Sequence, residues 1–123
     1  MIHIEAPWRI SGAELTIDAE PDTLETSEVE PLASYLEMAE ALLLSPGVIP
    51  DPFSENDNAV VRVGLMTDGT WVWDLAWSDY VRNHRVAPPS EFVEHVRTLK
   101  YTAPSISTEE VLRISDALGI PEE

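Results

Sequence analysis

The sequence predicts an α+β fold with a small antiparallel sheet of two hairpins, about four strands in all, packed with one long and about three short helices. Three observations support this. Two β-rich runs flank an Asp-Gly turn, an alternating segment lies near the N-terminus, and several later segments have helical hydrophobic spacing. The main alternative is two separate two-stranded ribbons on a mainly helical body. The 123 residues are predicted to form a single domain, 1–123.

The clearest hairpin turns at the Asp-Gly pair of positions 68–69, between residues 59–66 and residues 70–73. Glycine takes the positive φ of such a turn without steric cost. In the second strand Trp71 and Trp73 point to the same face. Because aromatic residues in strands mostly pack against other residues, we expect both indoles in the core; an exposed aromatic platform is the alternative.

The first hairpin is predicted from residues 2–5 and 13–19. In the second of these segments Leu15 and Ile17 alternate with polar residues, which is typical of a strand with one solvated face. The connecting loop contains Trp8, whose indole could cover the end of the sheet.

The long helix is predicted to begin at Ser27, which forms a capping-box pattern with Glu30. Its inward stripe continues through Ala39 to Leu43, a length of about four turns. The same segment contains no lysine or arginine that could pair with its outward glutamates at i, i+4 spacing. We therefore expect this helix to display uncompensated negative charge.

Residues 48–58 combine prolines, small polar residues and acids, and are predicted to form a long surface loop. Loops of this length in compact domains are often functional. Phe53 lies among the acids of this loop, so it is either an anchor for a partner or a side chain that pins the loop to the body of the protein.

Three shorter helices are predicted in the C-terminal half. Asp74 caps one that continues through His84, and Ser90 begins the next. The last one starts with a capping box at Ser107 and stops at Gly119.

The charge of the chain is strongly negative, with 23 acidic and 7 basic residues and a formal net charge of −16. Residues 1–58 contain most of this excess, since Arg9 is their only basic residue. Such a charge repels nucleic-acid phosphates and anionic membranes and accelerates encounter with a basic protein. We therefore expect no direct nucleic-acid binding and no membrane binding; the acidity could also serve solubility alone.

The residue types give little sign of catalysis. The chain has no cysteine, which excludes disulfides and thiolate chemistry and favours a cytoplasmic location. His3, His84 and His95 lack the spacing of a local zinc site. His84 with Asp79, or His95 with a neighbouring glutamate (Glu91 or Glu94), could form an acid–base pair, but such pairs on helix surfaces are usually only solvated. We predict no enzyme activity, no catalytic residue, no cofactor and no metal.

Residues 59–100 resemble the C-terminal half of small actinobacterial proteins that have an Asp-Gly turn, a Trp-x-Trp strand, an aromatic helix and a Pro-x-Glu-Phe start to the next helix. Some of these proteins resemble immunity proteins of polymorphic toxin systems. The resemblance implies a toxin-neutralising function, and it assigns no functional residue.

The hypothesis that follows is a non-enzymatic cytoplasmic immunity protein or inhibitor that occludes a basic toxin or nucleic-acid-binding enzyme. Its alternatives are a regulatory or structural interaction module without a toxin and, less favoured, a small hydrolase or transferase. The predicted partner-binding residues are the acids of the long helix and of the loop together with the aromatic ring between them: Glu28, Glu37, Glu40, Asp51, Phe53, Glu55 and Asp57.

Overall fold

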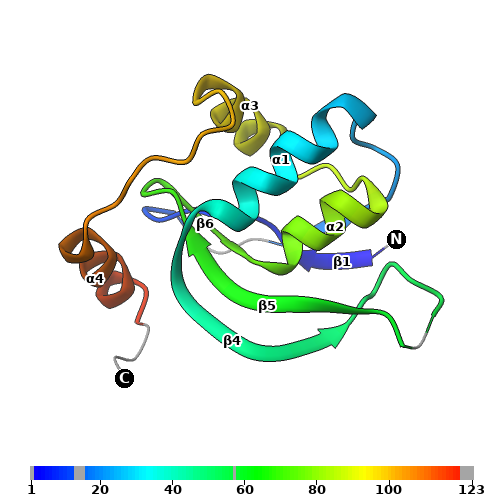
Figure 1. Cartoon of the computed structure of the whole chain (residues 1–123), viewed down its shortest axis with the longest axis horizontal. Coiled ribbons are helices and arrows are strands. Elements are labelled where there is room, and N and C mark those ends of the chain that lie inside the picture. The colour runs from blue at the N-terminus through cyan, green and yellow to red at the C-terminus, as the bar shows by residue number, and fades with distance from the viewer. Residues whose placement is uncertain (1, 13–15, 57, 120–123) are drawn as a thin grey trace.

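The computed structural model describes residues 2–12, 16–56 and 58–119, and the strands of this part of the chain form two antiparallel sheets (Figure 1). β1 (Ile2–Glu5) pairs with β3 (Thr16–Ala19). The larger sheet has the order β2 (Trp8–Arg9), β6 (Trp71–Asp74), β5 (Val60–Thr67) and β4 (Glu40–Pro50). The predicted α+β class is confirmed.

The helices are α1 (Thr26–Met38), α2 (Ala76–His84), α3 (Ser90–Thr98) and α4 (Thr108–Ala117). Figure 1 shows α1 and α2 side by side above the curved β4–β5 pair. A long segment leads from α3 to α4, which lies at the periphery and contacts β4.

The predicted central hairpin is confirmed. β5 and β6 pair with Met66 opposite Trp73, and the turn between them places Gly69 at a φ of 93°. Only glycine takes such a φ without strain. Trp71 and Trp73 are 4% and 0% exposed, so both indoles belong to the core, as expected.

The aromatic side chains of β6 contact the helices that pack on the sheet. The Trp73 Nε1–H donates to the carbonyl oxygen of Leu36 in α1 at 2.9 Å, which satisfies the one polar group of a fully buried ring. On the α3 side, Phe92 packs against Trp71 and Trp73 with ring centroids 5.3 and 5.4 Å away. From α2, the Trp77 Nε1–H donates to the carbonyl oxygen of Glu5 at 2.8 Å and holds β1.

The predicted first helix is wrong at both ends. α1 begins one residue before Ser27, with Glu25 at its N-cap and no side-chain cap, so the predicted capping box does not form. It stops at Met38, because Ala39 adopts an extended conformation with ψ at 175°. Residues 40–50 then form β4 and pair with the apolar strand β5. The predicted loop is correspondingly shorter, since Val48–Pro50 belong to this strand.

The N-terminal prediction is confirmed in part. β1 pairs with β3 over residues 16–19, whereas residues 13–15 of the predicted strand lie outside the described residues. The two predicted hairpins do not share one sheet. Trp8, expected in a loop, pairs with Val72 at the edge of β6 and is buried.

The predicted starts of the C-terminal helices are close to the observed ones. The Asp74 carboxylate accepts the Ala76 N–H at 3.0 Å at the start of α2, and α3 begins at Ser90. The Ser107 hydroxyl accepts the Glu110 N–H at 3.2 Å, as a capping box requires.

Candidate partner-binding surface

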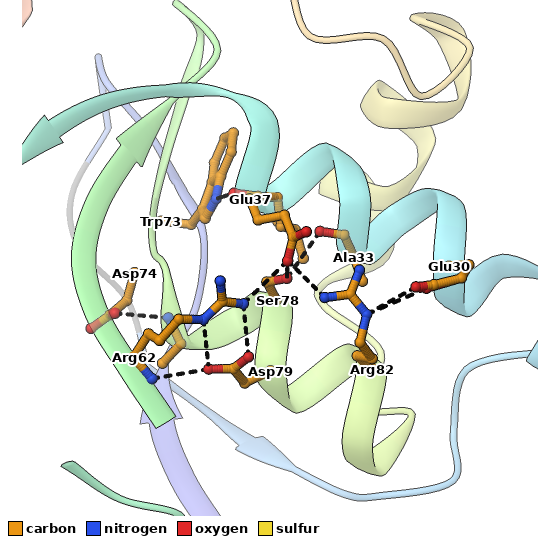
Figure 2. Close-up of polar contacts among 11 residues, drawn as sticks. Glu30, Ala33, Glu37, Arg62, Trp73, Asp74, Ser78, Asp79 and Arg82 are labelled. Carbon is orange, nitrogen blue, oxygen red and sulfur yellow. Dashed lines mark hydrogen bonds and ion pairs between the residues drawn. The ribbon is translucent and has the colours of Figure 1, made fainter. Parts of the chain in front are cut away.

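The acids of α1 pair with arginines that come from β5 and α2. Figure 2 shows the carboxylate of Glu37 between two guanidinium groups, with the Arg82 nitrogen at 2.7 Å and the Arg62 nitrogen at 3.1 Å. The Ser78 hydroxyl lies 2.9 Å from the same oxygen. Arg62 and Arg82 continue outward to further acids, Asp79 and Glu30 respectively.

These contacts have a clear electrostatic consequence. The hydrogen bond from Arg82, opposed by partial burial and aided by Ser78 and Arg62, lowers the pKa of Glu37 to about 2. Burial by itself would raise this pKa, so the arginines outweigh it. Glu37 therefore stays ionised at all ordinary pH values and fastens α1 to α2 and β5.

Glu28 is held in the same way at the other end of α1. Two Arg97 nitrogens donate to its carboxylate, each at 2.8 Å, and the Tyr101 hydroxyl donates at 2.6 Å. The Arg97 hydrogen bond is the main reason that the pKa of Glu28 lies below its ordinary value. Glu28 is only 7% exposed. The prediction that α1 displays uncompensated negative charge is thus wrong, because arginines from other elements supply the positive charge that the helix itself lacks.

The segment after β4 is fastened to α2. His84 Nε2 lies 2.7 Å from a carboxylate oxygen of the buried Asp51. The ring of Phe53 packs against Tyr80 and His84, with centroids 5.1 and 5.6 Å away. Phe53 therefore pins the loop, which is one of the two roles that the sequence left open. Its ring is only half-buried, so a contact with a partner stays a prediction.

The remaining predicted residues differ in position. Glu40 is exposed, but it opens β4 instead of continuing the helix. Glu55 is exposed at the tip of the loop. Asp57 lies outside the described residues. Glu40 and Glu55 therefore keep the solvent-facing charge that the hypothesis requires, whereas Glu28 and Glu37 pair with arginines and Asp51 contacts His84.

Sequence reasoning missed an apolar surface along β4. In the part of the chain that the structure describes, the exposed large apolar side chains are Met38, Leu43, Val48, Ile49, Val60 and Leu112. All but Leu112 lie on the end of α1, on β4 or on the paired start of β5, and α4, which carries Leu112, contacts β4. We call the exposed apolar positions Leu43, Val48, Ile49 and Val60 the β4 apolar surface; because Val48 and Ile49 are successive strand residues and point to opposite faces, these residues mark the edge of the sheet and not one of its faces. Its signal was present as apolar residues on both sides of Pro46, but we divided them between a helix and a loop.

β4 is also the last strand of its sheet. Edge strands are places where another chain can pair, and proteins usually protect them with charges, prolines or bulges. β4 has register shifts between Ala41 and Leu43 and between Leu44 and Val48, which interrupt its regular pairing with β5. The edge therefore suits side-chain contact with a partner better than extension of the sheet over its full length.

The histidines pair with carboxylates other than the predicted ones. His84 contacts Asp51, and His95 Nε2 lies 2.8 Å from the buried Asp68. The Asp68 carboxylate also accepts the Tyr35 hydroxyl and the backbone N–H groups of residues 70 and 71, so it organises the β5–β6 turn. Burial, with the nearby Asp68, raises the pKa of Tyr35. These pairs are parts of the structural framework.

The described residues contain no group of three or more histidine, aspartate or glutamate side chains placed to hold a metal ion. Within the same residues, no hydroxyl group is hydrogen-bonded to the imidazole of His84 or His95, as a nucleophile activated by a histidine would be. At the third histidine, the Thr16 hydroxyl lies 2.6 Å from His3 Nε2, and His3 Nδ1 lies 3.0 Å from Asp18; all three residues are exposed.

The fold and this surface define an α+β protein with a pinned acidic loop and an apolar sheet edge. No family model, no curated protein and no solved structure matches the chain. None of the helices in the described ranges combines the length and the apolar character that crossing a membrane requires.

Proposed function

We propose that the protein is a non-enzymatic cytoplasmic binding protein of the immunity or inhibitor type, which occludes a basic toxin or a basic nucleic-acid-binding enzyme. The observation that carries this proposal is the concentration of exposed large apolar side chains along β4 in a chain of net charge −16. Large exposed apolar patches rimmed by polar residues mark protein or membrane interaction sites or ligand-binding grooves, and the net charge favours a protein partner over an anionic membrane.

The two features have separate roles in this proposal. The β4 apolar surface supplies the desolvated centre of the interface, where most binding energy arises. Glu40 and Glu55 supply exposed charge near the two ends of the β4 and loop region. Rim charges act mainly on the association rate and its salt dependence, so they would draw in a basic partner and disfavour nucleic acid itself.

Co-purification from the native host followed by mass spectrometry identifies the partner. The expected result is a basic protein whose toxicity or nuclease activity is blocked in the complex. Retention of a protein whose activity is unchanged would favour the alternative, a regulatory or structural module. Failure to retain any basic protein would contradict the proposal.

The role of the β4 apolar surface is tested by measuring the affinity of variants for the partner identified in this way. Ile49→Lys places a charge in the β4 apolar surface and should raise the dissociation constant by about a hundredfold or more, as loss of a central contact does. Thr98→Lys, at an exposed site on α3, is the matched control because it makes the same charge change away from β4. Equal affinities of the two variants would remove β4 from the interface.

The charged rim is tested by kinetics. Reversing Glu40 and Glu55 to lysine should slow association at low salt by about tenfold or more, and the effect should fade as salt screens it. The dissociation rate should change less. An association rate that does not respond to the reversal would show that these acids do not steer the partner.

A further inference from the structure

A small cavity opens between β1, β6 and the start of α2. It has a volume of about 200 Å³ and is lined by Ile4, Glu5, Asp74, Ala76, Trp77 and Tyr80. Pockets that hold cofactors or drug-sized ligands usually measure about 300–1,000 Å³. The cavity is therefore large enough for one side chain or one small amine, and too small for a typical cofactor.

The walls of the cavity are aromatic and rigid. Trp77 and Tyr80 are 1% and 5% exposed, and their rings meet edge to face with centroids 5.7 Å apart. Phe53 packs against Tyr80 from the loop that follows β4. The cavity thus lies next to the predicted contact loop, in the same part of the molecule that the proposed function uses.

Asp74 differs from the other shielded acids of the protein. The remaining acids of the described residues that are buried or half-buried each lie within hydrogen-bond distance of an arginine or a histidine side chain; they are Glu28, Glu37, Asp51, Asp68, Asp79 and Glu110. Asp74 makes no ion pair within the described residues. Its carboxylate accepts the backbone N–H groups of Ala76 and Gly64, and no arginine or histidine of the described residues offsets the burial that raises its pKa.

The surroundings of the cavity add to this negative potential. Burial, together with the nearby charges of Asp74, Asp51 and Asp79, raises the pKa of Tyr80 to about 12. Three carboxylates therefore act on one phenol at the cavity wall. Such a site repels anions and favours a cation that can enter a narrow apolar opening.

We propose that this cavity receives the alkylammonium end of a lysine side chain from the partner, with the Asp74 carboxylate as its acceptor and the rings of Trp77 and Tyr80 around its methylene groups. This inference rests on the proposed function, because it supplies the basic partner with a specific contact. Aromatic faces also attract cations directly.

The chemistry of the cavity favours an ammonium over a guanidinium. Arginine binds carboxylates best through two parallel hydrogen bonds to both oxygens. At Asp74 the carboxylate already accepts the N–H groups of Ala76 and Gly64, so its two oxygens are not both free for a guanidinium. A slender methylene chain with a compact terminal charge also fits a small cavity better than a planar guanidinium does.

The first test needs no partner and uses n-butylammonium chloride as the probe, followed by nuclear magnetic resonance. The indole N–H signal of Trp77 and the amide signal of Ala76 should shift saturably. n-Butanol, which has the same chain without the charge, should bind at least tenfold more weakly. Equal effects of the two probes would overturn the proposal.

The second test removes the charge. Asp74→Asn keeps an oxygen that can accept the Ala76 N–H, and it should weaken n-butylammonium binding by at least tenfold. Glu109→Gln, which removes one exposed charge on α4, is the matched control and should leave binding unchanged. In the unsubstituted protein, the probe should lower the pKa of the Asp74 carboxyl, with Glu5, Asp51, Asp79 and Tyr80 as the neighbouring titratable groups. An Asp74 pKa that the probe leaves unchanged would overturn the proposal even if the variant fails to fold.

The two proposals can fail separately. Absence of n-butylammonium binding together with an intact complex would remove the lysine contact and leave the proposed function in place. If the probe binds at Asp74 but no basic protein is retained from the host, the proposed function is contradicted. The assignment of the bound ammonium group to a lysine of the partner is then contradicted as well. If both hold, replacing one lysine of the partner should reproduce the loss that Asp74→Asn causes.

Discussion

Glu37 and Asp74 are both shielded carboxylates beside α2, yet their pKa values move in opposite directions. Glu37 lies between Arg82 and Arg62, and the hydrogen bond from Arg82 is the main reason that its pKa falls to about 2. Asp74 is paired with no arginine, lysine or histidine of the described residues, and burial raises its pKa. The difference shows that the number of acids in this chain does not tell where its negative charge is available.

The comparison divides the acids into two groups. The acids at the α1–α2 contact each pair with an arginine in the folded chain, and these ion pairs hold the elements together. Asp74 pairs with no arginine or histidine of the described residues, and its carboxylate accepts backbone N–H groups beside a small cavity. Four substitutions test this difference, and their expected effects on stability decrease from Trp73→Ala to Ile49→Lys.

Trp73→Ala should cause the largest loss, about 3–5 kcal/mol, because it removes a ring that is 0% exposed and whose N–H holds Leu36 of α1. Denaturant unfolding followed by far-ultraviolet circular dichroism measures it. Because α1 and β6 meet at this ring, the loss of stability in this variant is the reference for the smaller effects expected at Glu37 and Asp74. A loss below about 1 kcal/mol would mean that the core beneath the two regions is not packed as described.

Glu37→Gln should cost about 2–3 kcal/mol at pH 7, because a carboxylate whose pKa falls from 4.5 to about 2 on folding stabilises the ionised folded state. This stabilisation is complete above about pH 4.5 and is lost as the pH falls towards about 2. Urea unfolding at several pH values measures it, and the gap between the two proteins should close over that range. A gap that is independent of pH would assign the loss to packing.

Asp74→Asn should raise the free energy of unfolding at pH 7 slightly. A folded-state pKa above the ordinary value of 3.8 means that the acid prefers its proton in the folded chain, so its ionisation costs stability as the pH rises through the raised pKa. Asparagine does not ionise and avoids that cost. Thermal unfolding at pH 3 and pH 7 should show a difference only at the higher pH. A variant less stable than the parent at pH 7 would show that the hydrogen bonds from the Ala76 and Gly64 N–H groups to the ionised carboxylate outweigh the cost of its burial.

Ile49→Lys should have the smallest effect on stability, within about 0.5 kcal/mol, because Ile49 is already 41% exposed. The same substitution should have the largest effect on partner binding. Measuring unfolding and binding on one sample separates the two. A loss of stability of several kcal/mol would show that the β4 apolar surface is covered in the folded protein.

The sequence by itself determined the features that depend on local chemistry. An Asp-Gly pair between two β-rich runs is sufficient to define the β5–β6 hairpin, and alternation places Trp71 and Trp73 on one face. The cap at Ser107 is likewise a contact between residues three positions apart. Such features are predictable because their physical cause lies within a few neighbouring residues.

The tertiary structure decided the rest. Residues 40–50 carry apolar side chains that suit a helix or a strand, and pairing with β5 selects the strand. Glu37 and Arg62 are 25 residues apart, and Glu28 and Arg97 are 69 apart, so no local pattern reveals that these acids are neutralised. The same holds for Asp74, whose place in a cavity without a cation depends on how β1, β6 and α2 meet. Composition determines the amount of charge, and only the packing of distant segments decides which charges are left for a partner.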